Sequence, residues 1–342
     1  MKDSQILSKI LVDNYWHLVG HKSELMNDKD YIKLDLLNRN IVVFNDDGEL
    51  LAFDNICPHR GTKFFSEDSG NQNIVCPYHG WSYRKGELKI PKKKEFSNCN
   101  LDEADLNKLN LDYCGDFIFV SFNPKQSLDE QLLKLKPILV EISIKMVSRI
   151  DLDYYEWSCD WPIAIENALE PYHISKVHPN TLSLLKLKKD RDIFYNENSI
   201  WKARINNKRI EAGMQKIHND FDVDVEYDGY QSILIFPFSF LSFTYGFTYS
   251  LQNFFPGNSS EKTNLHSRLF SSKVNKNDLT EYFLNSTIKT NRKIFSEDEN
   301  ICSQVYEDAW NVEPLKFWQD GELRINHFRE KLKYLLKKRE TQ

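Results

Sequence analysis

The chain has 342 residues, of which 41% are hydrophobic and 13% aromatic, so it can bury one or two sizeable cores. Its net charge of −5 gives no electrostatic footprint for nucleic acid, and no apolar run approaches the roughly 20 residues of a membrane span. The first residues carry charges on both sides of short apolar runs and do not resemble a secretory signal. We therefore expect no nucleic-acid or membrane partner.

The first third of the chain has the pattern of a small all-β domain. Residues 1–14 are expected to form a helix, and residues 15–125 the domain that follows it. The segment 31–55 alternates, is rich in β-branched residues and is broken at 45–48 (NDDG), which predicts a hairpin. The segment 116–124 (DFIFVSFNP) predicts another strand that ends at Pro124. Residues 126–147 are expected to be helical, with a break or kink at Pro137.

The remainder, residues 126–342, reads as a larger domain of mixed structure. It contains a predicted helix over roughly 161–177, a β-rich block that includes 229–256, and helices over roughly 277–308 and 320–338. Helices and strands that are grouped rather than alternating favour the α+β class. The expected architecture is thus a small all-β domain followed by a larger α+β domain.

Two cysteines and two histidines form the most specific motif of the chain. The six cysteines do not form the dense pattern of a disulfide scaffold, and the chain reads as cytoplasmic, where thiols stay reduced. Cys57 and His59 are in NICPHRG, Cys76 and His79 are in IVCPYHGWSY, and sixteen residues lie between His59 and Cys76. Each half therefore brings one thiolate and one imidazole to a tight turn. That division suits a Rieske [2Fe–2S] cluster, in which two Cys bind one iron and two His the other. Zinc sites more often pair Cys with Cys and His with His.

This motif resembles the Rieske signature of the Rieske non-haem iron oxygenases. The resemblance implies a Rieske domain in which Cys57 and Cys76 bind one iron, and His59 and His79 the other. It also implies that the second domain is a catalytic domain with an antiparallel sheet and helices, of the helix-grip (START-like) kind.

The segment 166–179 (ENALEPYHISKVHP) carries two further histidines beside a carboxylate. On a straight helix His173 and His178 would lie about 140° apart and would not share one metal ion. Pro171 should kink the helix unless it begins a new one, and Pro179 biases His178 away from the helical region. His178 is then free to turn toward His173. The residues alone leave two interpretations equally open, a metal site or two ordinary histidines.

A facial iron site needs one carboxylate ligand besides two imidazoles. Glu170, three residues before His173, is one candidate, and Asp298 in IFSEDENICSQV is the other. Asp298 lies on a predicted helical stripe, where a buried carboxylate is costly unless it is paired or metal-bound. That stripe consists of Ile294, Ile301 and Val305, and the flanking Glu297 and Glu299 are expected to be solvated.

The resemblance extends to both acidic segments and assigns their roles. DWPIAIENALEPYHISKVHPNTL is similar to the catalytic segment of these oxygenases, and EDENIC to their distal acidic motif. It implies that His173, His178 and Asp298 bind a mononuclear iron. It also implies that Glu170 connects His173 to a Rieske histidine, His79, of a neighbouring subunit. Asn167, on the same face as Glu170, is expected to support the site.

The resemblance implies a terminal oxygenase that takes electrons through a Rieske cluster to Fe(II). With O2 it would hydroxylate or oxidatively demethylate a small organic substrate. Electrons would come from NAD(P)H through a separate reductase or ferredoxin, since the chain has no G-x-G-x-x-G motif. A head-to-tail homotrimer is the implied assembly. Three alternatives stay open: a dioxygenase, a Rieske electron carrier without oxygenase activity, and a zinc-stabilised binding module.

Two further segments have a less specific pattern. Aromatic residues are dense between Tyr230 and Tyr249, and sheet core is the favoured interpretation, with a pocket wall as the alternative. The region of roughly 185–290, where the resemblance is weak, should line the substrate pocket. The run 84–96 (RKGELKIPKKKEF) is locally basic, which indicates either a solvated loop or a docking face for an acidic electron donor.

Overall fold

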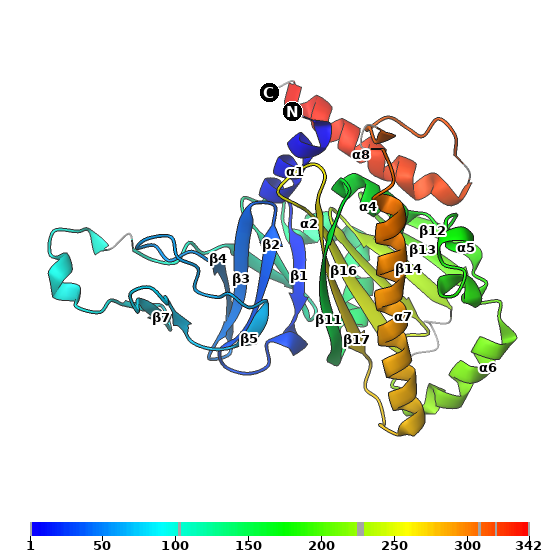
Figure 1. Ribbon diagram of the computed structural model, residues 1–342, viewed down its shortest axis with the longest axis horizontal. Coiled ribbons are helices and arrows are strands. Elements are labelled where there is room, and N and C mark those ends of the chain that lie inside the picture. The colour runs from blue at the N-terminus through cyan, green and yellow to red at the C-terminus, as the bar shows by residue number, and fades with distance from the viewer. Residues whose placement is uncertain (1, 102–103, 224–228, 307–308, 319, 341–342) are drawn as a thin grey trace.

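The computed structural model describes residues 2–101, 104–223, 229–306, 309–318 and 320–340. Figure 1 shows an elongated molecule in which a small β-rich part lies beside a larger part built of one broad sheet and several helices. This arrangement confirms the α+β class and the order of the two parts. Among the described helices, none combines the length and the apolar character that crossing a membrane requires.

The small part is built from short antiparallel strands in three sheets. Strands β2 (Asp30–Leu36), β3 (Arg39–Asp46), β4 (Glu49–Asp54) and β5 (Ser69–Asn71) form the first sheet. The predicted hairpin connects β3 and β4 through Asp47 and Gly48, which both have positive φ, as a two-residue turn of this kind requires. A second sheet contains β6 (Ile74–Val75), β7 (Ser82–Arg84) and β8 (Glu87–Lys89).

A third sheet joins this part to the chain termini. It contains β1 (His17–His21), β10 (Phe117–Ser121) and β9 (Asn110–Cys114). Helix α1 (Asp3–Asn14) precedes it and packs against α8 (Leu323–Glu340), so that the two ends of the chain lie close together (Figure 1). Leu7 and Leu11, four residues apart, are fully buried and supply the apolar side of α1.

The segment 126–147 is helical but breaks earlier than expected. Helix α2 (Leu128–Leu132) stops before Leu133, whose φ of 46° is incompatible with a continuing helix. Helix α3 (Lys136–Ser143) then begins with Pro137 in its first turn, where the missing N–H costs nothing. The prediction of a break at Pro137 was therefore wrong by a few residues, because proline here opens a helix instead of bending one.

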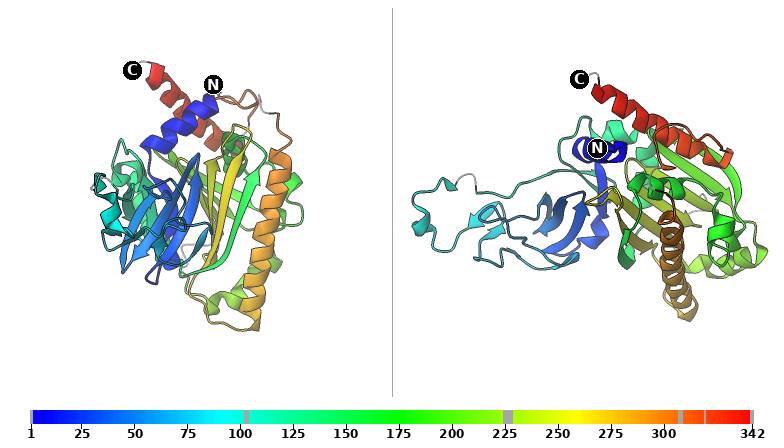
Figure 2. Two further views of the ribbon diagram at one scale, coloured as in Figure 1. Left: turned by 60° about the vertical axis from the view of Figure 1, so that its left-hand side comes forward. Right: turned by 45° about the horizontal axis from the view of Figure 1, so that its top comes forward.

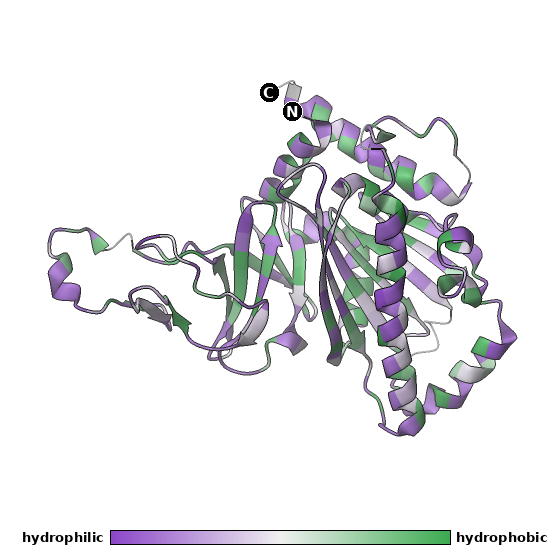
Figure 3. Ribbon diagram, in the orientation of Figure 1, coloured by the Kyte–Doolittle hydropathy of each residue, from purple (hydrophilic) through white to green (hydrophobic). Residues whose placement is uncertain are grey.

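One seven-stranded antiparallel sheet organises the large part. Its strands are arranged in the order β11 (Ser148–Trp157), β17 (Thr263–Ser271), β16 (Thr248–Pro256), β15 (Ser239–Thr244), β14 (Tyr230–Ile235), β13 (Asn198–Arg204) and β12 (Lys188–Tyr195). Helix α7 (Asp278–Cys302) and the shorter α4 (Trp161–Leu169) pack on one face of this sheet (Figure 2). Much of the outward side of α7 is hydrophilic (Figure 3). The sheet therefore has a covered face on which a site can be enclosed.

The aromatic residues between Tyr230 and Tyr249 lie mostly in the hydrophobic core, which was the favoured interpretation of this segment. Six of them are at most 3% exposed: Phe236, Phe238, Phe240, Phe243, Phe247 and Tyr249. Tyr230 and Tyr245 are only partly buried. Alternation along a strand places successive rings on opposite faces, so this set supplies the cores on both sides of the sheet.

Buried polar contacts fix the two parts against each other. Arg268 of β17 donates from Nη2 to the carbonyl oxygen of Val19 in β1 over 2.8 Å, and its Nε lies 3.3 Å from Oε1 of Glu24. Asn253 of β16 donates to the carbonyl oxygen of Leu18 over 2.8 Å. Since Arg268 and Asn253 are at most 1% exposed, leaving these groups without partners would be costly. The contacts therefore hold the small part in one orientation.

Candidate metal centres

Two matching loops hold the cysteines and histidines of the first motif. The N–H of Cys57 donates to the carbonyl oxygen of Thr62, and the carbonyl oxygen of Cys57 accepts from Gly61. Cys76 makes the equivalent pair of bonds with Trp81 and Gly80. Gly61 and Gly80 have φ values of +74° and +73°, which glycine adopts without steric cost. The sequence therefore builds the same tight turn twice, the second time between β6 and β7.

The side chains of these loops separate into an inner and an outer pair. Cys57 and Cys76 are 1% and 2% exposed, and burial together with the adjacent Cys76 thiol raises the pKa of Cys57. The rings of His59 and His79 lie outside them, with centroids 4.7 Å apart, and His79 is exposed. Trp81 stacks on His59 at 4.7 Å, almost parallel to it. Inner sulfur and outer nitrogen ligands fit a [2Fe–2S] cluster with one Cys-bound and one His-bound iron.

The segment with the second pair of histidines is not one helix. Helix α4 ends at Leu169, and Glu170, immediately before Pro171, is extended with φ of −117° and ψ of 141°. A short helix α5 (Ile174–Val177) follows, flanked by His173 and His178. The helix expected over 161–177 is thus interrupted at Pro171, where the sequence predicted a kink or a new helix. This break lets the two rings converge, with centroids 5.2 Å apart.

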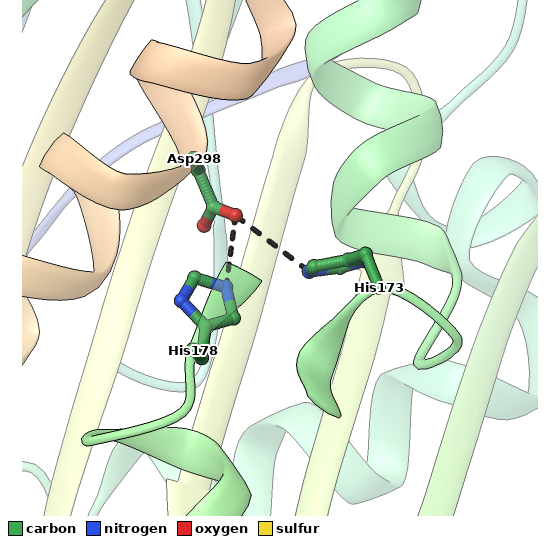
Figure 4. Close-up of side chains that lie close together, drawn as sticks. All are labelled: His173, His178 and Asp298. Atoms are coloured by element: carbon green, nitrogen blue, oxygen red, sulfur yellow. Dashed lines mark ion pairs between the residues drawn. The ribbon is translucent and has the colours of Figure 1, made fainter. Parts of the chain in front are cut away.

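Asp298 of α7 completes a compact group of three possible ligands. Its Oδ1 lies 2.9 Å from Nε2 of His178 and 3.6 Å from Nε2 of His173 (Figure 4). One ligand atom from each residue lies within 4.8 Å of the others. Nε2 of His178 is buried and has no hydrogen-bond partner among the described residues. Such an orphaned nitrogen beside a buried carboxylate fits a bound cation, and two imidazoles with one carboxylate suit Fe(II).

Carboxylates hold the outer nitrogen of both imidazoles. Nδ1 of His173 lies 2.6 Å from Oε1 of Glu170, and Nδ1 of His178 lies 2.8 Å from Oε2 of Glu297. Asn167 donates from Nδ2 to Oδ1 of Asp298 over 2.9 Å. Carboxylates that hold Nδ1 direct the lone pair of Nε2 toward the common centre, which is the usual arrangement around histidine ligands.

The local electrostatics favour positive charge. Burial by itself lowers the pKa of His178, but the nearby carboxylates of Asp298 and Glu297 raise that pKa above its usual value. Burial raises the pKa of Glu297, yet the hydrogen bonds from His178 and Thr181 bring it below its usual value. The group as a whole thus stabilises a cation between the Nε2 atoms and Asp298.

The structure brings together Asn167, Glu170, His173, His178 and Asp298, and it adds Glu297. The expectation that Glu297 is solvated was wrong, since its side chain is only 20% exposed and binds His178 and Thr181. The expected apolar stripe was also misplaced, because Ile301 and Val305 are 38% and 41% exposed. A buried histidine ligand needs a partner for Nδ1, but the sequence does not indicate which carboxylate supplies it.

The two centres lie in different parts of the molecule. The loop between β6 and β7 is in the small part, far from α4, α5 and α7, which hold the second centre (Figure 1). Two cavities adjoin this second centre. One, of about 220 Å³, is lined by Glu170, Ile301 and Val305, and a larger one of about 380 Å³ lies between α7 and the sheet.

Both parts of the chain match known protein families. Residues 15–100 match the Rieske [2Fe-2S] domain, and residues 145–338 match the ring hydroxylating alpha subunit (catalytic domain). The carnitine monooxygenase oxygenase subunit of Escherichia coli K12 is 31% identical over 174 residues, 48% of this chain and 46% of that protein. The glycine betaine monooxygenase oxygenase subunit of Chromohalobacter salexigens is 28% identical over 179 residues, 51% of this chain and 40% of that protein. The matched segments thus span less than half the length of these relatives.

Solved structures share the fold over nearly the whole chain. The quaternary ammonium Rieske monooxygenase CntA, in complex with L-carnitine, superposes with a TM-score of 0.78 at 19% identity, covering 97% of this chain and 92% of that one. Naphthalene 1,2-dioxygenase from Rhodococcus sp., bound to indole, has a TM-score of 0.71 at 18% identity, covering 96% and 91%. At this level of identity the similarity establishes the architecture of both parts.

Proposed function

The chain belongs to the ring hydroxylating alpha subunit family and carries a Rieske [2Fe-2S] domain, and on this premise we propose that it is a terminal oxygenase. It would take electrons through the Rieske cluster to a mononuclear Fe(II), and use O2 to hydroxylate or oxidatively demethylate a small organic substrate. The observation that carries the proposal is the convergence of Nε2 of His173, Nε2 of His178 and Oδ1 of Asp298. We further propose residues 15–125 and 126–342 as the two domains.

The proposed ligands follow from the two arrangements of side chains. Cys57 and Cys76 would hold the inner iron of the cluster, and His59 and His79 the outer one. His173, His178 and Asp298 would hold the mononuclear iron, while Asn167 keeps Oδ1 of Asp298 in place. When bound, the cluster supplies single electrons and the Fe(II) supplies the activation of O2. A metal held by these three protein ligands would keep coordination positions available for O2.

We propose that Glu170 connects His173 to His79 of a neighbouring subunit. Within one chain the two centres lie too far apart in the fold for such a contact (Figure 1). Oε2 of Glu170 accepts from the N–H groups of Tyr172 and His173, which fixes the carboxylate at the end of α4. Inter-subunit electron transfer is described for the CntA monooxygenase.

Exposed apolar side chains near both centres support a head-to-tail homotrimer. Near Glu170, Tyr172 is 69% exposed, and Val305 of the adjoining cavity is 41% exposed. Around the cluster motif, Ile56 is 49% and Tyr78 55% exposed. Exposed apolar groups gathered at a functional site are typical of an interaction surface. Contact between these two surfaces on different chains would bring His79 to Glu170.

Electrons would come from NAD(P)H through a separate reductase or ferredoxin. Lys92, Lys93 and Lys94 are exposed, and the last two begin a short 3₁₀ helix (Lys93–Phe96). Phe96 of this helix contacts the ring of His59 at 5.7 Å and that of Trp81 at 5.6 Å. The lysines therefore lie beside the proposed cluster, where an acidic donor would dock. We propose a cytoplasmic location, where thiols stay reduced and free to bind iron.

Metal content, spectroscopy and O2 uptake test the proposal together. The purified protein should contain about three irons per chain, two in the cluster and one in the facial site, and show the spectrum of a Rieske centre. With a reductase it should consume O2 when substrate is present. About two irons per chain and no substrate-dependent O2 uptake would indicate an electron carrier, and a colourless zinc protein would indicate a binding module. Incorporation of one oxygen atom of O2 into the product would indicate monooxygenation, and incorporation of both atoms would indicate dioxygenation.

A further inference from the structure

The cavity of about 380 Å³ leads directly to the proposed iron site. It shares Tyr230, Ser242, Gln252 and Ile294 with the smaller cavity, of about 70 Å³, that His173, His178 and Asp298 line. A volume of this size is within the range of small-molecule sites. A molecule held there would lie next to the atoms that face the proposed iron.

Helix α7 aligns this cavity with the iron ligand. Phe283, Thr287, Asn291 and Ile294 line the cavity, and they precede Asp298 at intervals of three or four residues. Residues at this spacing share one face of a helix. The face that presents Asp298 to the iron site is therefore also the wall of the cavity, which supports a single continuous site.

Neutral hydrogen-bonding groups cover the floor of the cavity. Ser242 of β15 and Ser250 of β16 are directly opposite each other in the sheet. Gln252 donates from Nε2 to Oγ of Ser242 over 3.2 Å and to Oγ of Ser250 over 3.0 Å. Oγ of Ser250 in turn donates to Oδ1 of Asn291 over 3.0 Å. These bonds leave Oε1 of Gln252 without a donor among the described residues, and so able to accept from a ligand.

None of the described residues that line this cavity carries a formal charge. Arg324 lines the smaller cavity but is only 1% exposed. Its guanidinium already donates from Nε to Oγ of Ser199 over 2.9 Å and from Nη1 to Oγ of Ser232. Oδ1 of Asp298 accepts from Asn167 and lies 2.9 Å from Nε2 of His178, and Oε1 of Glu170 lies 2.6 Å from Nδ1 of His173. A charged group buried here would lose its hydration without gaining a counter-charge, which is strongly unfavourable.

Aromatic rings are the alternative way to hold a cation. Trp157, Trp201, Phe240, Phe254 and Phe295 line the smaller cavity, but each is at most 5% exposed. Histidines aside, Tyr230 is then the one partly exposed ring among the described residues that line it, and one ring does not make a cage. Phe240 and Phe254 pack edge to face on each other, with centroids 5.7 Å apart. Their faces are thus largely used in packing within the protein.

We propose that the substrate of this site is an uncharged molecule with hydrogen-bonding groups, held over Ser242, Ser250 and Gln252. This inference rests on the proposed function, since it takes the cavity beside His173, His178 and Asp298 as the oxygenase pocket. It separates this chain from relatives named for carnitine and glycine betaine, two compounds that each contain a carboxylate and a quaternary ammonium group. The same fold would then act on a different chemical class.

Four molecules of one shape, differing only in charge, provide the test. They are γ-butyrobetaine, its primary amide, the carboxylate in which a tert-butyl group replaces the trimethylammonium group, and the amide of that carboxylate. In this order, the first molecule carries both charges, the second only a positive charge, the third only a negative charge, and the fourth no charge. Benzamide and benzoate add a neutral and an anionic member of a second shape. Titration calorimetry with the iron-loaded protein should show that each neutral member binds about ten-fold or more tightly than its charged partners. Equal or tighter binding of a charged member, or no binding of either neutral member, would overturn the inference.

A charge placed on the cavity floor should reverse this preference. Gln252→Glu adds a carboxylate of nearly the same shape, so the uncharged amide should bind about ten-fold more weakly and the cationic amide more tightly. Gln215→Glu adds the same charge on the exposed side of α6 (Lys208–Ile217) and should change neither affinity. An unchanged order of affinities in Gln252→Glu would contradict the assignment of this floor. Because the iron content is measured in every sample, a missing mononuclear iron is recognised separately as a failure of the proposed function.

Discussion

Nδ1 of His178 lies 2.8 Å from Oε2 of Glu297, the residue that immediately precedes Asp298 on α7. One turn of this helix thus supplies both the carboxylate that faces Nε2 of His178 and the carboxylate that holds its Nδ1. On the other side of the site, Glu170 holds Nδ1 of His173 in the same way. Both imidazoles are therefore fixed in the tautomer that presents an unprotonated Nε2 to a metal.

Removal of the carboxylate behind His178 should weaken iron binding without removing a ligand. In Glu297→Ala, we expect the affinity for the mononuclear iron to fall about 10- to 100-fold, because Nδ1 of His178 loses its partner. Metal titration followed by iron analysis measures this change. Glu299→Ala removes a carboxylate from the other side of Asp298 and is the matched control. Equal affinities in the two variants would show that Glu297 does not orient His178.

Glu170→Gln should separate iron binding from electron transfer. The amide has the size of the carboxylate but lacks its charge, so both metal centres should persist while electron transfer between subunits slows about ten-fold or more. Stopped-flow absorbance of the reduced Rieske centre, followed in a single turnover with O2 and substrate, measures the rate. Glu299→Gln provides the control for loss of a nearby charge. If Glu170→Gln transfers electrons at the wild-type rate, the connection runs through other residues.

The lysines beside the cluster motif should control electron uptake. Reversing Lys92, Lys93 and Lys94 to glutamate should slow reduction by an acidic donor about ten-fold at low salt, because complementary charge accelerates encounter. The rate should also lose most of its dependence on ionic strength. Lys208→Glu with Lys216→Glu, both on exposed positions of α6, is the control. Reduction at the wild-type rate by a donor known to support turnover would exclude this docking face.

Acid should destabilise the fold through a buried histidine between the two parts. His17 is 1% exposed, and burial lowers its pKa from 6.5 to about 4. Between these values the unfolded chain binds a proton that the folded protein does not. The contribution of neutral His17 to the free energy of unfolding is therefore fully present above pH 6.5 and decreases as the pH falls toward 4. The free energy of unfolding lost over this pH range amounts to about 3 kcal/mol. Urea unfolding from pH 7 to pH 4 should give a flatter pH dependence for His17→Gln than for wild type or for His218→Gln. If the free energy of unfolding of His17→Gln depended on pH as steeply as that of wild type, His17 would not be the cause of the acid destabilisation.

The sequence predicted features that depend on short-range chemistry. Cysteine and histidine spacing defines two identical turns, and their glycines satisfy a local backbone requirement. The prolines around His173 and His178 indicated that the two rings could converge, and the cost of burying a carboxylate selected Asp298. These arguments need only neighbouring residues and helical geometry. The assignment of metal ligands to these residues stays a prediction until iron is measured.

Long-range contacts were not predictable in the same way. Glu297 looks like a solvated helix residue until α5 is placed beside α7, because its partners are more than a hundred positions away in the chain. The pairing of Arg268 with Glu24 depends likewise on how the two parts meet. The neutral cavity combines side chains from the sheet, α6 and α7, and hydrophobic periodicity alone does not order these elements in space.

The central claim is that His173, His178 and Asp298 hold a catalytic iron, and iron analysis of Asp298→Ala tests it most directly. We expect the iron content to fall from about three to about two per chain, with loss of substrate-dependent O2 uptake and an unchanged Rieske spectrum. The unchanged spectrum serves as the internal control for folding. Asp298→Ala protein that still holds about three irons per chain and oxygenates substrate at the wild-type rate would contradict the account.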